Sequence, residues 1–374
     1  MLIKEIKLEN FRSYEFLEMP INKGLNLIYG SNGSGKSTII ESIYYALSGK
    51  SFRTTETNNL IRNQTNQLQA LLVFFDGKTV KVTKKTNNTA IITQNKGQKR
   101  ENYTSLVKKF PTCLVENKEF FFSSSNPEQK RSFMNKTLFY VEQEGSTKIN
   151  ELKKIVAQRA GCLKNKDFNQ IKYWDEQLIL IEPIITDLNQ KLCEELNKAL
   201  KNSNIVDVFV QNNPWLNDLT IKYLPGYDVN DIFTDILSQN LEKDAILKRT
   251  TAGPHKRSFD ILIKNKAASE TLSRGQQKII SIILHLIQRE IIKINTGSDP
   301  ILLMDDISSE LDKENANLML KYLIDISVQT IMTSIEKAHF SAHKDVFLFH
   351  VEHKGDTSYA VSYTHLTLPT ILLV

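Results

Sequence analysis

The fold of this chain is decided by one glycine-rich stretch, Gly30-Ser31-Asn32-Gly33-Ser34-Gly35-Lys36-Ser37-Thr38. Its small residues let successive backbone N–H groups curl around a chain of phosphates, because glycine adopts conformations closed to other residues. At this spacing Lys36 reaches the outer phosphates and the hydroxyl of Ser37 is placed to ligate magnesium. The stretch therefore predicts a nucleoside triphosphate site in which all nine residues bind the ligand and Lys36 is catalytic.

Both flanks of this stretch support the interpretation. Residues 24–29 read as a short buried strand, and residues 39–47 carry apolar side chains at helical spacing before Gly49 ends the helix. Strand, loop and helix thus stand in the order that a phosphate-binding loop requires. The alternative, a glycine-serine turn without a ligand, does not account for these flanks.

Composition places the chain among globular proteins with a large core. It has 374 residues, of which 41% are hydrophobic, and a formal net charge of +6. This size favours two lobes, and the modest positive excess favours a polyanionic partner without proving one. No apolar run approaches a membrane span, and residues 1–11 alternate as a strand does, so we expect a cytoplasmic protein without a membrane partner. The three cysteines lie far apart and are expected to be buried thiols: Cys113, Cys162 and Cys193.

The order of predicted elements indicates an α/β core interrupted by helices. Strand patterns occupy most of the first 122 residues and return after Thr250, while the middle is charged and helical. Within that middle, Pro183 and the small number of heptads argue against a long coiled coil. We expect four parts: residues 1–126 and 245–361 as the two halves of the nucleotide-binding head, 127–244 as an inserted helical lobe, and 362–374 as an anomalous tail.

The tail fits nothing before it. It follows a plausible closing strand at 358–361 and ends in bare apolar residues, Thr370-Ile371-Leu372-Leu373-Val374. A foreign or misread segment is one interpretation, and a genuine apolar terminal strand is the other.

Two adjacent carboxylates supply the second half of the predicted site. Residues 301–304 are apolar and are followed by Asp305 and Asp306, as expected of a buried strand that presents acids at its carboxyl edge. We assign Asp305 to magnesium binding and Asp306 to the water that attacks the γ-phosphate. Taken alone, an apolar run before aspartate is also an ordinary strand end.

Two further segments resemble the motifs of ABC-type ATPases. Leu272-Ser273-Arg274-Gly275-Gln276-Gln277-Lys278 resembles their signature sequence, and Ser309-Glu310-Leu311-Asp312 resembles their D-loop. A helix N-terminus with serine and glycine offers N–H groups that can grip a γ-phosphate. In that superfamily the grip is made across a dimer, which implies that Ser273, Gly275 and Gln276 bind the nucleotide held by the Lys36 of the other subunit. A plain helix cap would use Ser273 and Gly275 equally well.

Finer details resemble the head domain shared by SMC proteins and the RecF family, and the match to RecF is close. It spans about residues 1–361 and rests on segments that occur in RecF order: 8–14, 51–54, 126–134, 174–178, 251–255, 272–278 and 302–312. The resemblance implies an ABC-type ATPase head with an inserted helical lobe. It also implies ATP and Mg²⁺ as ligands.

The function implied by this resemblance is recombinational DNA repair. A RecF-like ATPase dimerises on ATP, binds double-stranded DNA near gaps, and helps RecA loading with RecR and RecO, with slow, DNA-stimulated hydrolysis. A positively lined clamp would bind phosphates with little sequence preference and a steep salt dependence. The alternatives are an SMC-like tethering protein, for which the insert is too short, and the ATPase subunit of a transporter.

Three further residues each have two alternative roles. Arg12, expected to contact the nucleotide, and Arg53 either touch phosphates or pair with an acidic neighbour, and His255 is structural or functional with equal weight. The chain also departs from the usual RecF pattern. Asn135 replaces a common aspartate, Arg257-Ser258 replace an acidic pair, and Asn315 replaces a basic residue. Arg257 could thereby add to a basic, DNA-facing surface.

Overall fold

The computed structural model describes residues 1–95, 99–116, 127–142, 144–306, 311–335, 345–355 and 357–363. By its internal packing the chain divides into two compact units. The first unit comprises Met1–Glu119 with Ser298–Val374, and the second comprises Phe120–Gly297. Residues 245–297 therefore pack within the second unit. The four-part domain division stays a prediction.

A six-stranded sheet that is mostly parallel carries the phosphate loop in the first unit. Its strand order is β15-β14-β3-β13-β12-β8, and only β15 is antiparallel to its neighbour. The carboxyl ends of the parallel strands meet at one edge, where α/β folds bind ligands. The strands are β3 (Leu25–Tyr29), β8 (Thr112–Glu116), β12 (Ile301–Asp305), β13 (Thr330–Ser334), β14 (Val346–Lys354) and β15 (Thr357–Tyr363).

An antiparallel sheet forms a second layer of the first unit, in the order β2-β1-β4-β5-β6-β7. Its strands alternate buried apolar and more exposed residues, which is why one face joins the core. The strands are β1 (Ile3–Phe11), β2 (Tyr14–Pro20), β4 (Gln67–Phe74), β5 (Thr79–Lys85), β6 (Ile91–Gln94) and β7 (Lys99–Glu101).

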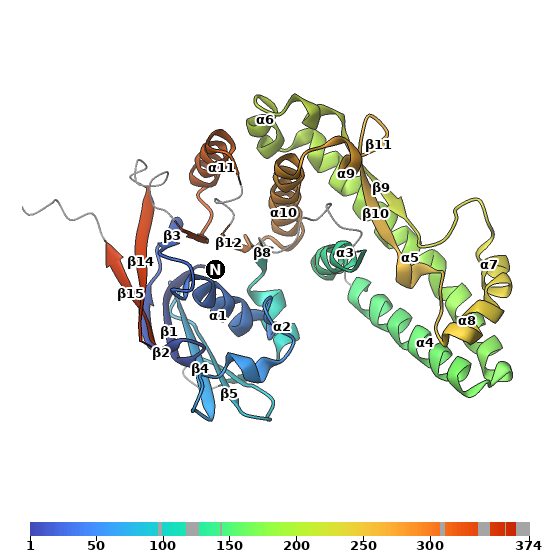
Figure 1. The fold of residues 1–374 in the computed structure, drawn as a ribbon, viewed down its shortest axis with the longest axis horizontal. Coiled ribbons are helices and arrows are strands. Elements are labelled where there is room, and N and C mark those ends of the chain that lie inside the picture. Colours follow the sequence, from blue (N-terminus) through green and yellow to red (C-terminus); the bar gives the residue numbers. More distant parts are fainter. Residues whose placement is uncertain are drawn as a thin grey trace, which may run out of the picture. The chain divides into compact units, whose positions relative to one another are not determined.

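Helix α1 (Lys36–Ser48) contacts strands of both sheets and is buried along most of its length (Figure 1). Ile39, Ile40 and Ile43 are fully buried in the common core, and each contributes about 1.5–3 kcal/mol of burial free energy. The phosphate loop therefore precedes a rigidly held helix. Three other helical segments complete the described first unit: η1 (Thr57–Leu60), α2 (Tyr103–Lys109) and α11 (Lys313–Asp325).

The second unit is built on two long helices that pack side by side, α4 (Gly145–Asn165) and α5 (Phe168–Asn202) (Figure 1). Pro183 lies inside α5 and does not end it. The remaining helical segments are α3 (Pro127–Val141), α6 (Asn204–Val210), η2 (Pro214–Asp218), α7 (Phe233–Gln239), α8 (Leu241–Leu247), η3 (Pro254–Lys256), α9 (Ala268–Thr271) and α10 (Arg274–Thr296).

The second unit also contains a sheet of its own. Strand β10 (Ser258–Ile263) pairs antiparallel with β9 (Leu219–Leu224) and with β11 (Lys266–Ala267). The sequence pattern predicted the strand at 259–263 but assigned it to the nucleotide-binding core. Its partner β9 lies in the segment that was expected to be helical. The pairing of β10 with this distant segment therefore places β10 in the second unit.

Other expectations have simpler outcomes. All three cysteines are buried, and none of them forms a disulfide. No helix in the described part of the chain combines the length and apolar character needed to cross a bilayer. The closing strand extends to Tyr363, and the remaining tail residues, 364–374, lie outside the described ranges.

Candidate nucleotide-binding site

Two glycines hold the phosphate loop close to the neighbouring strands. A side chain at Gly30, which has φ 155°, would run into the carbonyl oxygen of Val351 in β14. At Gly35, with φ 110°, a Cβ atom would lie 2.7 Å from Ser358 Oγ and 3.0 Å from the hydroxyl of Tyr14. The Tyr14 hydroxyl donates to the Gly35 carbonyl at 3.3 Å. A larger residue at either glycine would push the loop out of place.

Lys36 folds back into the loop that precedes it. Its Nζ donates to the carbonyl oxygens of Gly30 and Ser31, each at 2.8 Å, and the residue is buried. Burial lowers the pKa of Lys36, while the nearby charges of Asp306 and Asp305 raise it. The Lys36 ammonium is thus bonded to two neutral carbonyl oxygens, and phosphate oxygens are better acceptors for an ammonium group.

The remaining loop residues fit a polyphosphate ligand. The Oγ of Ser34 is buried without a hydrogen-bond partner, and a buried hydroxyl of that kind needs one. Ser31, Asn32 and Gly33 are exposed at the mouth of the loop. Ser37 and Thr38 occupy the first turn of α1, where N–H groups generally lack intrahelical partners, although the Thr38 N–H donates to the Gly35 carbonyl at 3.1 Å. The loop therefore offers donors toward a ligand.

The predicted acids stand at the end of β12, at the same sheet edge as the loop: Asp305 is the last residue of the strand and Asp306 follows it. Thr333 of β13 connects them. The Thr333 hydroxyl donates to Asp305 Oδ1 at 2.8 Å and accepts from the N–H of Asp306 at 2.8 Å. Asp306 has φ 52°, a left-handed conformation that is uncommon for a residue other than glycine. The sequence analysis did not single out Thr333, because only strand pairing brings it next to Asp305.

Arg12 and Arg53 both contact Glu41 of α1, a residue that the sequence analysis missed. Arg12 forms a two-point ion pair with Glu41 at 2.9 and 2.7 Å, and Arg53 approaches the same carboxylate at 3.4 Å. Each arginine thus has the acidic neighbour considered as one alternative. Their contact with phosphates stays a prediction. A carboxylate placed among the apolar residues of 39–47 was the available signal, since such a group needs a cation.

The signature-like segment forms a helix cap in the second unit. Ser273 Oγ accepts from the N–H of Gln276 at 3.3 Å, and Gln276 Oε1 accepts from the N–H of Ser273 at 2.9 Å. This reciprocal capping box begins α10, and Ser273 and Gly275 are exposed. The cap accounts for these residues locally, and their predicted nucleotide contact stays a prediction.

The D-loop-like segment is described only in part, because residues 307–310 lie outside the described ranges. Asp312 caps α11 by accepting from the Asn315 N–H at 2.9 Å and from Asn315 Nδ2 at 2.7 Å. Asn315, one of the departures from the RecF pattern, therefore supports a helix start.

Arg257 does not belong to a basic surface, and that expectation is wrong. The residue is 2% exposed, and its guanidinium donates to Asn189 Oδ1 at 3.2 Å, to the Pro254 carbonyl at 3.1 Å, and to Asn135 Oδ1. Burial lowers the pKa of Arg257 to about 10. Two departures from the RecF pattern, at 135 and 257, thus contact one another inside the second unit.

His255 has a structural role in the same turn. Its Nε2 lies 3.0 Å from the Thr250 carbonyl, and burial lowers the pKa of His255 to about 4. The imidazole is therefore neutral at physiological pH, which suits a buried turn better than phosphate binding.

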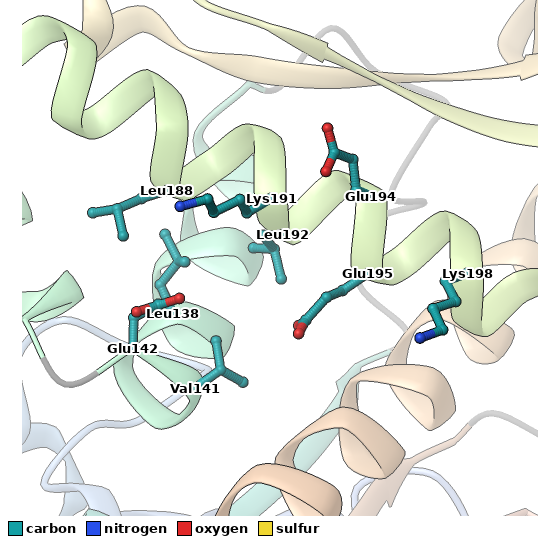
Figure 2. Close-up of a pocket in the computed structure, with 9 residues that line it drawn as sticks. All are labelled: Leu138, Val141, Glu142, Leu188, Lys191, Leu192, Glu194, Glu195 and Lys198. Atoms are coloured by element: carbon teal, nitrogen blue, oxygen red, sulfur yellow. The ribbon is translucent and has the colours of Figure 1, made fainter.

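Figure 2 shows a pocket of about 310 Å³ in the second unit, between α3 and α5. Apolar side chains such as Leu138, Val141 and Leu192 line it together with carboxylates and lysines. Burial, followed by the charge of Glu142, raises the pKa of Glu195 at its wall. None of the predicted nucleotide-site residues lines this pocket, and its acids would repel phosphate.

This chain is similar to known proteins over nearly its whole length. The family model described as the RecF/RecN/SMC N terminal domain matches residues 2–358. The chain belongs to the RecF/RecN/SMC family. The DNA replication and repair protein RecF of Shewanella oneidensis is 28% identical over 359 residues, covering 94% of this chain and 98% of that protein.

Solved structures agree on the fold of this RecF/RecN/SMC family member. The recombination mediator protein RecF with ATPrS, in the RecFOR pathway, superposes with a TM-score of 0.80 at 23% identity, covering 97% of this chain and 98% of the other. An Smc head bound to the C-winged helix domain of ScpA reaches a TM-score of 0.58 at 15% identity, covering 98% of each chain. The predicted ABC-type ATPase head and the predicted likeness to RecF are confirmed. The chain is a RecF/SMC-type ATPase.

Proposed function

We propose that this ATPase dimerises on ATP, clamps double-stranded DNA near gaps, and acts with RecR and RecO to help RecA loading. The observation that carries the proposal is the sheet edge where the Lys36 loop and the Asp305-Asp306 pair meet, in a chain similar to RecF over 94% of its residues. The RecF relative with ATPrS is described as a recombination mediator, which supports the same role here.

The residues at this edge divide the work of hydrolysis. Lys36 and the N–H groups of the loop would hold the β- and γ-phosphates, and Ser37 with Asp305 would hold Mg²⁺. The ion would neutralise charge that develops on the phosphate oxygens. Asp306 would orient the attacking water, and its backbone is already fixed by Thr333.

Dimerisation would complete the site. Ser273, Gly275 and Gln276 lie at the start of α10, where the positive end of the helix dipole attracts an anion. In the proposed dimer they bind the nucleotide held by the Lys36 loop of the partner. ATP would then connect the two subunits, and hydrolysis would release DNA.

DNA-stimulated ATP hydrolysis, with oligomeric state followed in parallel, tests this proposal. Lys36→Arg and Asp306→Asn should each lower the hydrolysis rate about 100-fold or more, and Asp306→Asn should trap the dimer on DNA. Ser273→Arg should abolish the dimer through its bulk. Ser273→Ala is its matched control, because it removes only the cap, at about 1 kcal/mol of helix stability.

The opposite pattern would also be informative. Hydrolysis that persists in a monomer and ignores both DNA and Ser273→Arg would rule out the clamp and leave nucleotide binding alone.

A further inference from the structure

Glu41 of α1 is a buried carboxylate close to the phosphate loop. Its side chain is fully buried, and its two oxygens accept four hydrogen bonds. Oε1 accepts from Arg12 Nη2 at 2.7 Å and from Ser51 Oγ at 2.5 Å. Oε2 accepts from Arg12 Nε at 2.9 Å and from Arg53 Nη1 at 3.4 Å. We name Glu41, Arg12, Arg53 and Ser51 the Glu41 cluster.

The Glu41 cluster carries an excess positive charge beside the phosphate loop. A buried carboxylate requires one cation, and here it has two. Glu41 lies on α1, one turn after Thr38, the last residue of the loop stretch. The Thr38 hydroxyl itself accepts from Arg53 at 3.4 Å. One guanidinium charge in this cluster is therefore uncompensated by Glu41 and faces the start of α1.

The two arginines are held to different degrees. Arg12 is bound by two short bonds and its side chain is 22% exposed, whereas Arg53 has longer contacts and is 35% exposed. Arg53 can therefore move with little loss of bonding, while Arg12 neutralises the buried carboxylate. Hydrogen bonds weaken as they lengthen, so Arg53 would exchange them readily for a phosphate.

We propose that Glu41 is a positioning residue of the ATPase: paired with Arg12, it holds Arg53 at the first turn of α1, ready for the nucleotide phosphates. Neither the family likeness nor the loop motif assigns this role to Glu41. The proposal deepens the proposed function and rests on ATP binding at Lys36. Preorganising a side chain in this way reduces the entropy lost when the ligand binds.

ATP binding and steady-state hydrolysis of Glu41→Gln in the full chain test the proposal. Because Arg53 would lose its charge-assisted hydrogen bond to Glu41, the KM for ATP should rise about tenfold or more. The kcat should change less, because Asp306 and Lys36 are intact. Glu41→Asp keeps the charge and should restore much of the affinity.

Asp244→Asn is the matched control. Asp244 is also a buried carboxylate paired with arginine, Arg159, but it lies in the second unit. Both variants should lower the melting temperature, and only Glu41→Gln should raise the KM. Equal loss of stability with an unchanged KM in Glu41→Gln would reduce Glu41 to a structural role and overturn the proposal.

Arg53→Gln keeps the test decisive if Glu41→Gln does not fold. Arg53 is partly exposed, so this variant should fold and show the same rise in KM, and combining it with Glu41→Gln should add little. Wild-type affinity in Arg53→Gln, alongside lost binding in Lys36→Ala, would overturn the inference and leave the proposed function standing. Undiminished ATP binding in Lys36→Ala would instead contradict the proposed function itself.

Discussion

Two buried ion clusters, one in each unit, use the same chemical groups in opposite proportion. In the first unit Glu41 pairs with two arginines, and in the second Arg159 pairs with two aspartates, Asp175 at 2.5 Å and Asp244 at 2.6 Å. The first cluster has an excess positive charge and the second an excess negative one. The first lies beside the phosphate-binding loop of its own unit.

The clusters also differ in how completely they are closed. Arg159 is fully buried and Asp244 nearly so, and Asp244 also accepts from the N–H and the hydroxyl of Thr251. The Arg159 cluster thereby ties α4, α5 and α8 to the chain that follows α8. The partly exposed arginines of the Glu41 cluster are not enclosed in this way. A closed cluster stabilises a fold, and a cluster with an accessible arginine can also bind a ligand.

Removing the closed cluster's cation should have the largest effect. Arg159→Met leaves Asp244 buried without its counter-ion, which should lower the free energy of unfolding by about 3–5 kcal/mol. Both tryptophans of the chain, Trp174 and Trp215, lie in the second unit, so denaturation followed by tryptophan fluorescence reports on that unit. ATP binding by the folded variant should be unchanged. A parallel loss of ATP affinity would erase the functional distinction between the clusters.

Acid should lower the free energy of unfolding of the second unit by nearly as much as Arg159→Met does. Burial lowers the pKa of His285 to about 4 from an ordinary 6.5, which corresponds to about 3 kcal/mol. The unfolded chain binds the proton first, so this stability is complete above pH 6.5 and is lost as the pH falls toward about 4. Tryptophan-detected unfolding between pH 7 and 4.5 measures the loss. His285→Leu should remove about half of this loss, because His255, whose pKa burial also lowers to about 4, contributes a similar part, and an unchanged profile would contradict the assignment.

Adding a carboxylate beside Arg257 should have the smallest effect on the free energy of unfolding, and it should raise that energy instead of lowering it. Arg257 is a buried guanidinium with neutral partners, in contrast to both ion clusters. Asn135→Asp would give it a counter-ion and should stabilise the second unit by about 1–2 kcal/mol. Asn189→Asp offers a second position for the same test. If neither variant raises the midpoint of tryptophan-detected urea unfolding, neutral partners already suffice for a buried arginine.

Much of the fold and of the central site could be predicted because the signals are local. The strand at 25–29, the loop and α1 follow one another within 25 residues, and the acids directly follow an apolar strand. Each depends on backbone preferences and on the burial pattern of adjacent residues. The likeness to RecF showed that distant segments follow one another in the RecF order, but it did not show which residues contact each other.

Contacts between residues far apart in the sequence could not be predicted from these local signals. Glu41 meets Arg12 across 29 residues, and Arg257 meets Asn135 across 122. Arg257 reads as a surface cation by its type alone, and strand 258–263 reads as part of the central sheet until β9 is seen beside it.

By itself, the sequence determined the phosphate loop, the acid pair and the α/β class, since neighbouring residues encode turns, helices and strand ends. Tertiary structure alone decided the partners of Glu41, the link from Thr333 to Asp305, and the burial of Arg257. The reason is physical: a charge acquires its role from the groups brought within a few ångströms of it, and strand pairing and helix packing set those neighbours.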